Sequence, residues 1–194
     1  MEDWENIKFK TVFLKKAIPS DVRIEDLKYW ISRFEFYDLC EPRAGRSYGN
    51  MSFRVKPGEN EFIITAAHQV FGEDMPDDRF VKVIRCDIEK NIVEVEGLMP
   101  PSSETLIHYV VYKTRPDVNA VLHGHCRKLV CSVDLGFPST TNEKDRMPEL
   151  LAEIEKMLSD ENFIIIKNHG FLALGKDIDD SGRITLRAYQ RCFQ

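Results

Sequence analysis

The sequence has no long apolar run and no apolar leader. None of its 194 residues belongs to a stretch that approaches the roughly 18 apolar residues of a membrane span. The first 20 residues, MEDWENIKFKTVFLKKAIPS, mix charges throughout and lack the apolar region of a signal peptide. We therefore expect a cytoplasmic protein that does not associate with a membrane.

The sequence lacks regularly spaced cysteines. The five cysteines are an odd number without a CxxC pair, and four residues separate Cys126 from Cys131 in CRKLVC. This pattern excludes a cysteine-based disulfide scaffold and argues against a closed structural zinc site, which takes four ligands, mostly cysteine. A reduced protein is expected.

An excess of basic residues is also missing. The formal net charge is −5 and the sequence pI is about 5.6, which argues against a nucleic-acid partner but leaves room for a local pocket for a small anion. With 43% hydrophobic and 30% charged residues, the composition is that of a soluble globular protein. The length suits one domain that covers residues 1–194.

Helical and strand patterns are intermixed along the chain. The expected helices lie within 18–39, 99–117 (after Pro101 and before Pro116), 148–160 and 177–194. The expected strands are 51–55, 61–67, 118–125, a strand or strand pair in 162–175, and two strands around a polar turn within 81–97. Ser20 or Asp21 is the candidate N-cap of the first helix, and Gly182 is expected to interrupt or delay the last. Several strand connections are too short for crossovers, so we expect an α/β fold with a largely antiparallel central sheet.

Two of the five histidines lie one residue apart in NAVLHGHCRKL. Because side chains alternate along a strand, His123 and His125 project from the same face, and Gly124 should leave the opposite face unobstructed. This geometry suits two ligands of one zinc ion, although isolated pairs of this kind are more often structural or surface residues. His169, at the polar edge of a second apolar strand, is a third candidate. Three protein ligands and one open position are typical of catalytic zinc.

The segment PPSSETLIH offers polar groups at the start of a predicted helix. Ser102 and Ser103 are either simple N-caps or, with the free backbone N–H groups there, a site for an anion such as phosphate. Glu104 either complements the helix dipole or serves as a general base or metal ligand. His108 lies on the same helix face as Glu104 and is expected to be a core or supporting histidine rather than a ligand.

The segment RSYGNMSFR carries short polar side chains into a strand. Asn50 and Ser52 are either ordinary turn residues or a second wall of an anion pocket. Arg46 and Arg54 are candidate charge partners, although solvated surface arginines are the simpler interpretation.

Taken together and in order, three segments resemble the class II aldolase/adducin family. They are GNMSFR at 49–54, PSSETLIHYVVYKTRPDVNAVLHGH at 101–125 and NHGFLALG at 168–175, and the middle one is the most specific. The resemblance covers roughly residues 9–190. It implies a three-layer α/β/α fold around a mixed, mainly antiparallel sheet, and usually a cyclic homotetramer with active sites between subunits.

The same resemblance implies roles for individual residues. It assigns zinc binding to His123, His125 and His169, and acid/base work to Glu104, which in such enzymes also ligates zinc at rest. It assigns phosphate contacts to Asn50, Ser102 and Ser103. Substrate hydroxyl and carbonyl oxygens would chelate zinc, which stabilises an enediolate while Glu104 moves the proton.

The sequence departs from the family pattern in two places. Where relatives have a Ser/Thr-Gly pair after the second strand, this chain has Ala67 and His68, and His68 can supply a donor or a positive charge to the phosphate instead. The segment 126–150 holds no tyrosine to act as the proton donor of the aldolases. Tyr189 is a candidate by default only, and a packing role is the simpler interpretation.

The resulting prediction is a zinc-dependent aldehyde-lyase that cleaves a small phosphorylated ketose by retro-aldol chemistry. On the same scaffold, 4-epimerisation, dehydration of a ketose phosphate, or decarboxylation of a sugar-acid phosphate remain alternatives. A non-catalytic, adducin-like assembly module is the alternative from another class, and it predicts that the metal ligands are lost.

Overall fold

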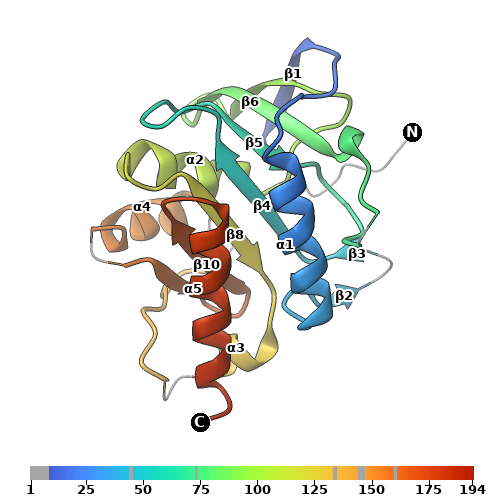
Figure 1. Cartoon of the computed structure of the whole chain (residues 1–194). Coiled ribbons are helices and arrows are strands. Elements are labelled where there is room, and N and C mark those ends of the chain that lie inside the picture. The colour runs from blue at the N-terminus through green and yellow to red at the C-terminus, as the bar shows by residue number, and fades with distance from the viewer. Residues whose placement is uncertain (1–8, 44–45, 73, 133–134, 144–146, 160) are drawn as a thin grey trace.

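The centre of the molecule is a single large sheet. The computed structural model describes residues 9–43, 46–72, 74–132, 135–143, 147–159 and 161–194. The strands of the sheet are β1 (Lys10–Lys15), β4 (Gly49–Arg54), β5 (Phe62–Thr65), β6 (Phe80–Asp87), β7 (Ile92–Glu96), β8 (Ala120–Gly124), β9 (Phe163–Ile166) and β10 (Gly170–Gly175). Their spatial order is β1-β7-β6-β5-β4-β8-β10-β9 (Figure 1). β1 runs parallel to β7 and the other neighbours are antiparallel, which confirms the prediction of a mixed, mainly antiparallel sheet.

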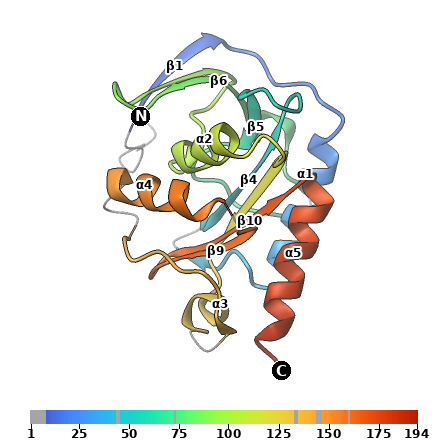
Figure 2. The ribbon, with the colours of Figure 1, turned by 90° about the vertical axis from the view of Figure 1, so that its left-hand side faces the viewer.

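Helices cover both faces of this sheet. They are α1 (Ile24–Phe36), α2 (Thr105–Thr114), α3 (Arg127–Cys131), α4 (Met147–Met157) and α5 (Ile178–Arg191), with a short 3-10 helix at Asp77–Arg79 and a small separate ladder of β2 (Pro42–Arg43) and β3 (Arg46–Ser47). α2 and α4 lie on one face, and α1 and α5 lie on the other (Figure 2). None of the described helices has the length and apolarity that crossing a bilayer requires.

Two hydrophobic cores lie on the two faces, and strand alternation explains them. Along β8, Val121 packs in the core beneath α2 and α4, whereas Leu122 packs in the core beneath α1 and α5. Burial of apolar side chains on both sides of one sheet is what joins the three layers. The predicted α/β/α architecture is therefore confirmed.

The predicted N-cap of α1 is wrong. The helix begins at Ile24, its N-cap is Arg23, and no side chain caps it. The Asp21 carboxylate is instead held by the guanidinium of Arg23 at 2.6 Å and by the Arg23 backbone N–H. This local ion pair lowers the pKa of Asp21 and competes with capping. Ser20 lies further outside the helix.

Gly182 does not interrupt the last helix, contrary to prediction. α5 is continuous, and its N-cap Asp177 accepts a hydrogen bond from the backbone N–H of Asp180. A Cβ at position 182 would lie 2.2 Å from the ring of Trp30 on α1. Glycine at this position therefore serves the close approach of α1 and α5 rather than a helix break.

Arg54 is not a solvated surface residue, contrary to prediction. It is only 1% exposed and donates hydrogen bonds to the backbone oxygens of Tyr112 (2.9 Å), Arg115 (2.9 Å) and Val118 (3.0 Å). These carbonyls lie at and just beyond the C-terminal end of α2. The side chain of Arg46 lies outside the described part of the structure.

Candidate metal centre and active site

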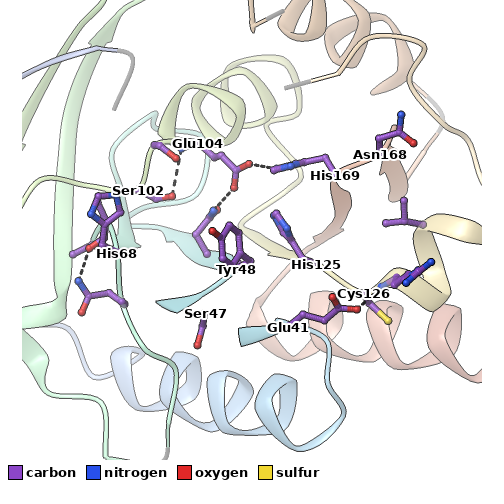
Figure 3. Close-up of a pocket in the computed structure, with 18 of the residues that line it drawn as sticks. Glu41, Ser47, Tyr48, His68, Ser102, Glu104, His125, Cys126, Asn168 and His169 are labelled. Atoms are coloured by element: carbon purple, nitrogen blue, oxygen red, sulfur yellow. Dashed lines mark hydrogen bonds and ion pairs between the residues drawn. The ribbon is translucent and has the colours of Figure 1, made fainter. Parts of the chain in front are cut away.

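A cavity of about 670 Å³ opens at the end of the sheet where α2 begins. Its walls come from segments far apart in the chain: the start of β4, the segment after β5, the turn before α2, the end of β8 and the β9–β10 turn (Figure 3). α3, which the sequence analysis did not predict, adds the outer wall. Antiparallel pairing of β4 with β8 and of β8 with β10 brings these segments together.

Four side chains that the sequence analysis singled out converge at the cavity; Glu104, His125 and His169 line it, and His123 is buried beside them. Glu104, His123, His125 and His169 offer ligand atoms that all lie within 4.8 Å of one another. His123 and His125 come from the end of β8 and its continuation, on the same face. His169 lies in the tight turn between β9 and β10. β10 pairs with β8 so that Leu172 lies opposite His123. The His125 and His169 ring centroids are 4.2 Å apart.

The donor set fits a divalent metal ion. Because the carbonyl oxygen of Phe171 can only accept, Nδ1 of His123 donates to it at 2.8 Å, and in the neutral imidazole Nε2 then presents a lone pair. That lone pair is 3.0 Å from Oε2 of Glu104, in a geometry that makes no hydrogen bond. A lone pair facing a buried carboxylate needs a cation between them. Three imidazoles and a carboxylate, with one imidazole oriented by a backbone carbonyl, are typical of zinc.

At Gly124, the face of β8 opposite to His123 and His125 is closely packed rather than open. A Cβ at position 124 would lie 2.3 Å from the carbonyl oxygen of Leu39 and 2.8 Å from the ring of Phe171. The prediction of an unobstructed face behind the two histidines is therefore wrong. Glycine permits this dense packing, which holds the end of β8 firmly.

Glu104, and not Ser102 or Ser103, is the N-cap of α2. The Glu104 side chain makes no capping hydrogen bond and turns into the cavity, where it is 3% exposed. Nδ2 of Asn50 donates to its Oε2 at 2.5 Å, and Nε2 of His169 contacts its Oε1. Ser102 lies in the preceding turn, where its carbonyl oxygen accepts from the backbone N–H of Thr105 at 3.0 Å. The capping prediction is thus wrong, because the chain turns before the helix starts.

The residues expected to contact phosphate all line the cavity. His68 and Ser102 lie toward one end (Figure 3), Ser103 follows Ser102 in the chain, and Asn50 is hydrogen-bonded to Glu104. His68 has φ of 58°, in the left-handed region that favours glycine, so an imidazole occupies a backbone conformation that a glycine would adopt more easily. Asn50 is bound to Glu104 in this structure, so it orients the carboxylate.

His108 lies in the core, as expected from its place on α2. It is completely buried, and its Nδ1 lies 2.7 Å from Oγ of Ser52, which in turn lies 2.7 Å from the hydroxyl of Tyr112. Burial lowers the pKa of His108 to about 3. This histidine is therefore neutral, and it is not one of the four clustered residues.

Sequence analysis missed several residues of the cavity wall. Tyr48 lies beside His125, with ring centroids 5.2 Å apart, and Glu41 and Arg127 lie at the end of the cavity near α3. Strand alternation could have indicated Tyr48, because it lies two residues before Asn50 and therefore on the same face. Nothing in the sequence pattern indicated Glu41 or Arg127. Tyr189 instead packs between Tyr37 and Phe193, as its packing interpretation expected.

Comparisons with known proteins agree with this arrangement. Residues 44–187 match the family model described as Class II Aldolase and Adducin N-terminal domain. An L-fuculose phosphate aldolase of Methanocaldococcus jannaschii is 30% identical over 173 residues, which cover 76% of this chain and 86% of that protein. A methylthioribulose-1-phosphate dehydratase of Leptospira biflexa is 36% identical over 77 residues, covering 40% of this chain and 35% of that protein. A solved structure of an L-fuculose 1-phosphate aldolase has a TM-score of 0.68 at 21% identity, covering 91% of this chain and 85% of that one.

Proposed function

This chain belongs to the class II aldolase and adducin family, and on that premise we propose that it is a zinc-dependent aldehyde-lyase acting on a small phosphorylated ketose. One observation carries the proposal: three imidazoles and a carboxylate converge at a cavity whose lining also includes the hydroxyls of Ser102 and Ser103 and the imidazole of His68. An assembly module would have no need to keep such a set.

The proposed metal ligands are His123, His125 and His169, with Glu104 as a fourth in the absence of substrate. A bound zinc ion would supply Lewis-acid stabilisation of negative charge on substrate oxygens. Because His123 is 1% exposed and Glu104 is 3% exposed, water is largely excluded from this side of the cluster, which strengthens electrostatic interactions there.

Glu104 is the proposed acid/base residue. Its carboxylate lies at the positive end of α2, and the amide of Asn50 donates to it at 2.5 Å. Both contacts favour the ionised form and hold the oxygen atoms in place. From this position Glu104 would transfer a proton between substrate and solvent.

Phosphate binding is proposed for the end of the cavity formed by His68, Ser102 and Ser103. Two hydroxyls and an imidazole are suitable donors for phosphate oxygens. His68 has a backbone conformation that favours glycine, and the presence of an imidazole there supports a functional role for this side chain. A homotetramer, as the family resemblance implies, remains part of the proposal.

A second candidate reaction is dehydration of a ketose phosphate. The similarity to a methylthioribulose-1-phosphate dehydratase over 77 residues favours it. Dehydration uses the same metal, phosphate site and base, but a hydroxyl group leaves instead of a carbon fragment. The two reactions are separated by whether dihydroxyacetone phosphate is formed.

The test is a zinc-reconstituted assay with L-fuculose 1-phosphate and other ketose phosphates, in which dihydroxyacetone phosphate is measured. Glu104→Gln should retain zinc through the three histidines and lower kcat by about 100- to 10,000-fold. Glu155→Gln, on the exposed face of α4, is the matched control and should leave kcat unchanged. A folded protein that binds no zinc, or a Glu104→Gln variant with full activity, would contradict the proposal.

A further inference from the structure

The cavity extends from the metal-binding cluster in two directions. In Figure 3, His68 lies toward one end, His125 and His169 lie in the middle, and Glu41 lies toward the other end, near α3. In the proposed reaction, the phosphate group occupies the His68 end, and the oxygen atoms beside the breaking C–C bond lie at the cluster. The aldehyde fragment, on the far side of that bond, therefore extends toward α3.

The α3 end carries a fixed positive charge. Among the described residues that line the cavity, Arg127 is the only arginine or lysine. The other basic side chains of the lining are histidines, whose charge depends on pH. A guanidinium keeps its charge throughout the physiological pH range, and its planar fork matches the oxygen atoms of a carboxylate or a phosphate.

The side chain of Arg127 lies on the cavity face of α3. Arg127, Val130 and Cys131 all line the cavity, and their spacing of three and four residues is that of one helix face. The next residue, Lys128, lies off this face, with its ammonium 4.7 Å from the ring centroid of Phe193. Two adjacent basic residues therefore have different surroundings, and only Arg127 adjoins the substrate cavity.

The guanidinium of Arg127 has no partner within the described part of the chain, either as an ion pair or as a hydrogen bond. Other arginines at the surface have one. Arg115 pairs with Asp117 at 2.7 Å. Arg183 pairs with Asp179 at 3.2 Å. Arg127 lines a cavity instead, so its donors are available to a ligand there.

The backbone that carries Arg127 is fixed to the metal site. Cys40 forms a bridge with His125, and the backbone N–H of Glu41 donates to the carbonyl oxygen of His125 at 3.1 Å. Oε1 of Glu41 in turn accepts from the backbone N–H of Arg127 at 3.2 Å. The arginine side chain therefore starts from a defined point, two residues beyond a proposed metal ligand.

On the premise of the proposed aldolase function, we propose that Arg127 selects substrates whose aldehyde fragment carries an anionic group, a carboxylate or a phosphate. The substrate is then anionic at both ends, with its first phosphate near His68 and its second anion at Arg127. A neutral fragment would cover the guanidinium without supplying an acceptor, and a donor that is covered and left unpaired weakens binding. L-fuculose 1-phosphate, whose aldehyde fragment is neutral, is accordingly a poorer substrate.

Two matched pairs of aldehydes test this selectivity in condensation with dihydroxyacetone phosphate. Glyoxylate and glycolaldehyde differ by a carboxylate in place of a hydroxymethyl group, and glyceraldehyde 3-phosphate and glyceraldehyde differ by a phosphate. The zinc-loaded wild type should prefer the anionic member of one pair by at least about tenfold in kcat/KM, the effect of a charge-assisted hydrogen-bond pair. The pair with the larger preference identifies the anion.

Three variants show whether Arg127 causes the preference. Arg127→Met should reduce it to about unity, and Arg127→Lys should keep part of it, because an ammonium has charge but no planar fork. Lys128→Met is the matched control: it removes the same charge one residue along and should keep the wild-type preference. Zinc content should be the same in all three variants.

Three outcomes would overturn the proposal. The first is a wild type that uses the anionic and neutral members of both pairs equally well. The second is a parallel loss for anionic and neutral aldehydes in Arg127→Met, which indicates a structural role. The third is an equal loss of preference in Lys128→Met, which indicates a general effect of net charge.

Binding measurements separate this proposal from the proposed function. Calorimetry compares the affinities of ribitol 5-phosphate, 5-phosphoribonate and ribitol 1,5-bisphosphate, which share one carbon chain and differ in the group at its far end. A preference for an anionic far end that depends on Arg127, without condensation of any aldehyde, would contradict the proposed reaction and support the anion site. Condensation of neutral aldehydes without any such binding preference would overturn the anion site alone.

Discussion

The two ends of helix α2 lie over the same strand, β4, and they are completed in opposite ways. At the N-terminal end, Glu104 turns into the cavity and meets Asn50 and His169. At the C-terminal end, the guanidinium of Arg54 donates to the carbonyl oxygens of Tyr112 and Arg115. One end is open to a cavity and the other is closed by a buried side chain.

Both ends use buried polar residues, so burial of a polar side chain does not by itself identify the site. Every hydrogen bond of the Arg54 guanidinium goes to a neutral oxygen of this chain, and a positive charge there complements the negative end of the helix. At the open end, the lone pair of His123 faces a carboxylate. The functional end is therefore the one whose groups need a cation and a ligand to complete them.

The largest expected effect concerns the closed end. Arg54→Met should lower the free energy of unfolding by about 3–5 kcal/mol, because several buried carbonyl oxygens lose their donors. Urea unfolding measures this change, and the zinc content of the folded variant should match the wild type. Arg183→Met, which removes an exposed pair with Asp179, is the control and should change stability by less than about 0.5 kcal/mol. Equal stability of the two variants would show that Arg54 does not seal the helix end.

The next effect distinguishes two buried histidines. His123→Ala should weaken zinc binding by more than about 100-fold, since even residues that only support ligands contribute 10- to 100-fold. His108→Leu should change zinc affinity little, because His108 contacts Ser52 and lies outside the cluster. Competition with a chelator measures both affinities. Equal losses of zinc affinity in the two variants would show that His123 and His108 do not differ in their role in metal binding.

The pH dependence of the free energy of unfolding should show that His108 is buried and neutral. Burial lowers the pKa of His108 from 6.5 to about 3, so below pH 6.5 the unfolded chain binds a proton that the folded chain does not. The stabilisation is complete above pH 6.5 and is lost as the pH falls, at up to about 1.4 kcal/mol per pH unit. Urea unfolding of chelator-treated wild type and His108→Leu should give a shallower pH slope for the variant. Parallel slopes would contradict the buried, neutral state of His108.

The smallest expected effect concerns the hydrogen bond that holds the turn carrying His169. Asn168 has φ of 54° and donates to Oε1 of Glu143 at 2.7 Å, which holds the turn that carries His169. Glu143→Ala should weaken zinc binding by about tenfold, in the range of residues that orient ligands. Glu155→Ala is the control. Unchanged zinc affinity of Glu143→Ala would show that the turn needs no such support.

Much of the fold followed from local patterns. Alternation and turn residues predicted the strands that became β4 to β10, and apolar spacing predicted α1, α2, α4 and α5. The helix caps were predicted less well, because Asp21 binds Arg23 and because the chain turns at Ser102 before α2 begins. β1 and α3 had no clear local signal, since β1 is defined by its pairing with β7 and α3 has only five residues.

The sequence by itself determined which residue types carry chemistry and, through alternation, that His123 and His125 share a face. It also carried the ordered segments that identify the family. Only the tertiary structure decided that Asn50 binds Glu104, that Tyr48 adjoins His125 and that Arg54 is buried. These contacts depend on the register between strands that are some 70 residues apart in the chain and on the crossing of α2 over β4. A shift of one residue in that register would turn every side chain of β4 to the other face, and no local pattern specifies it.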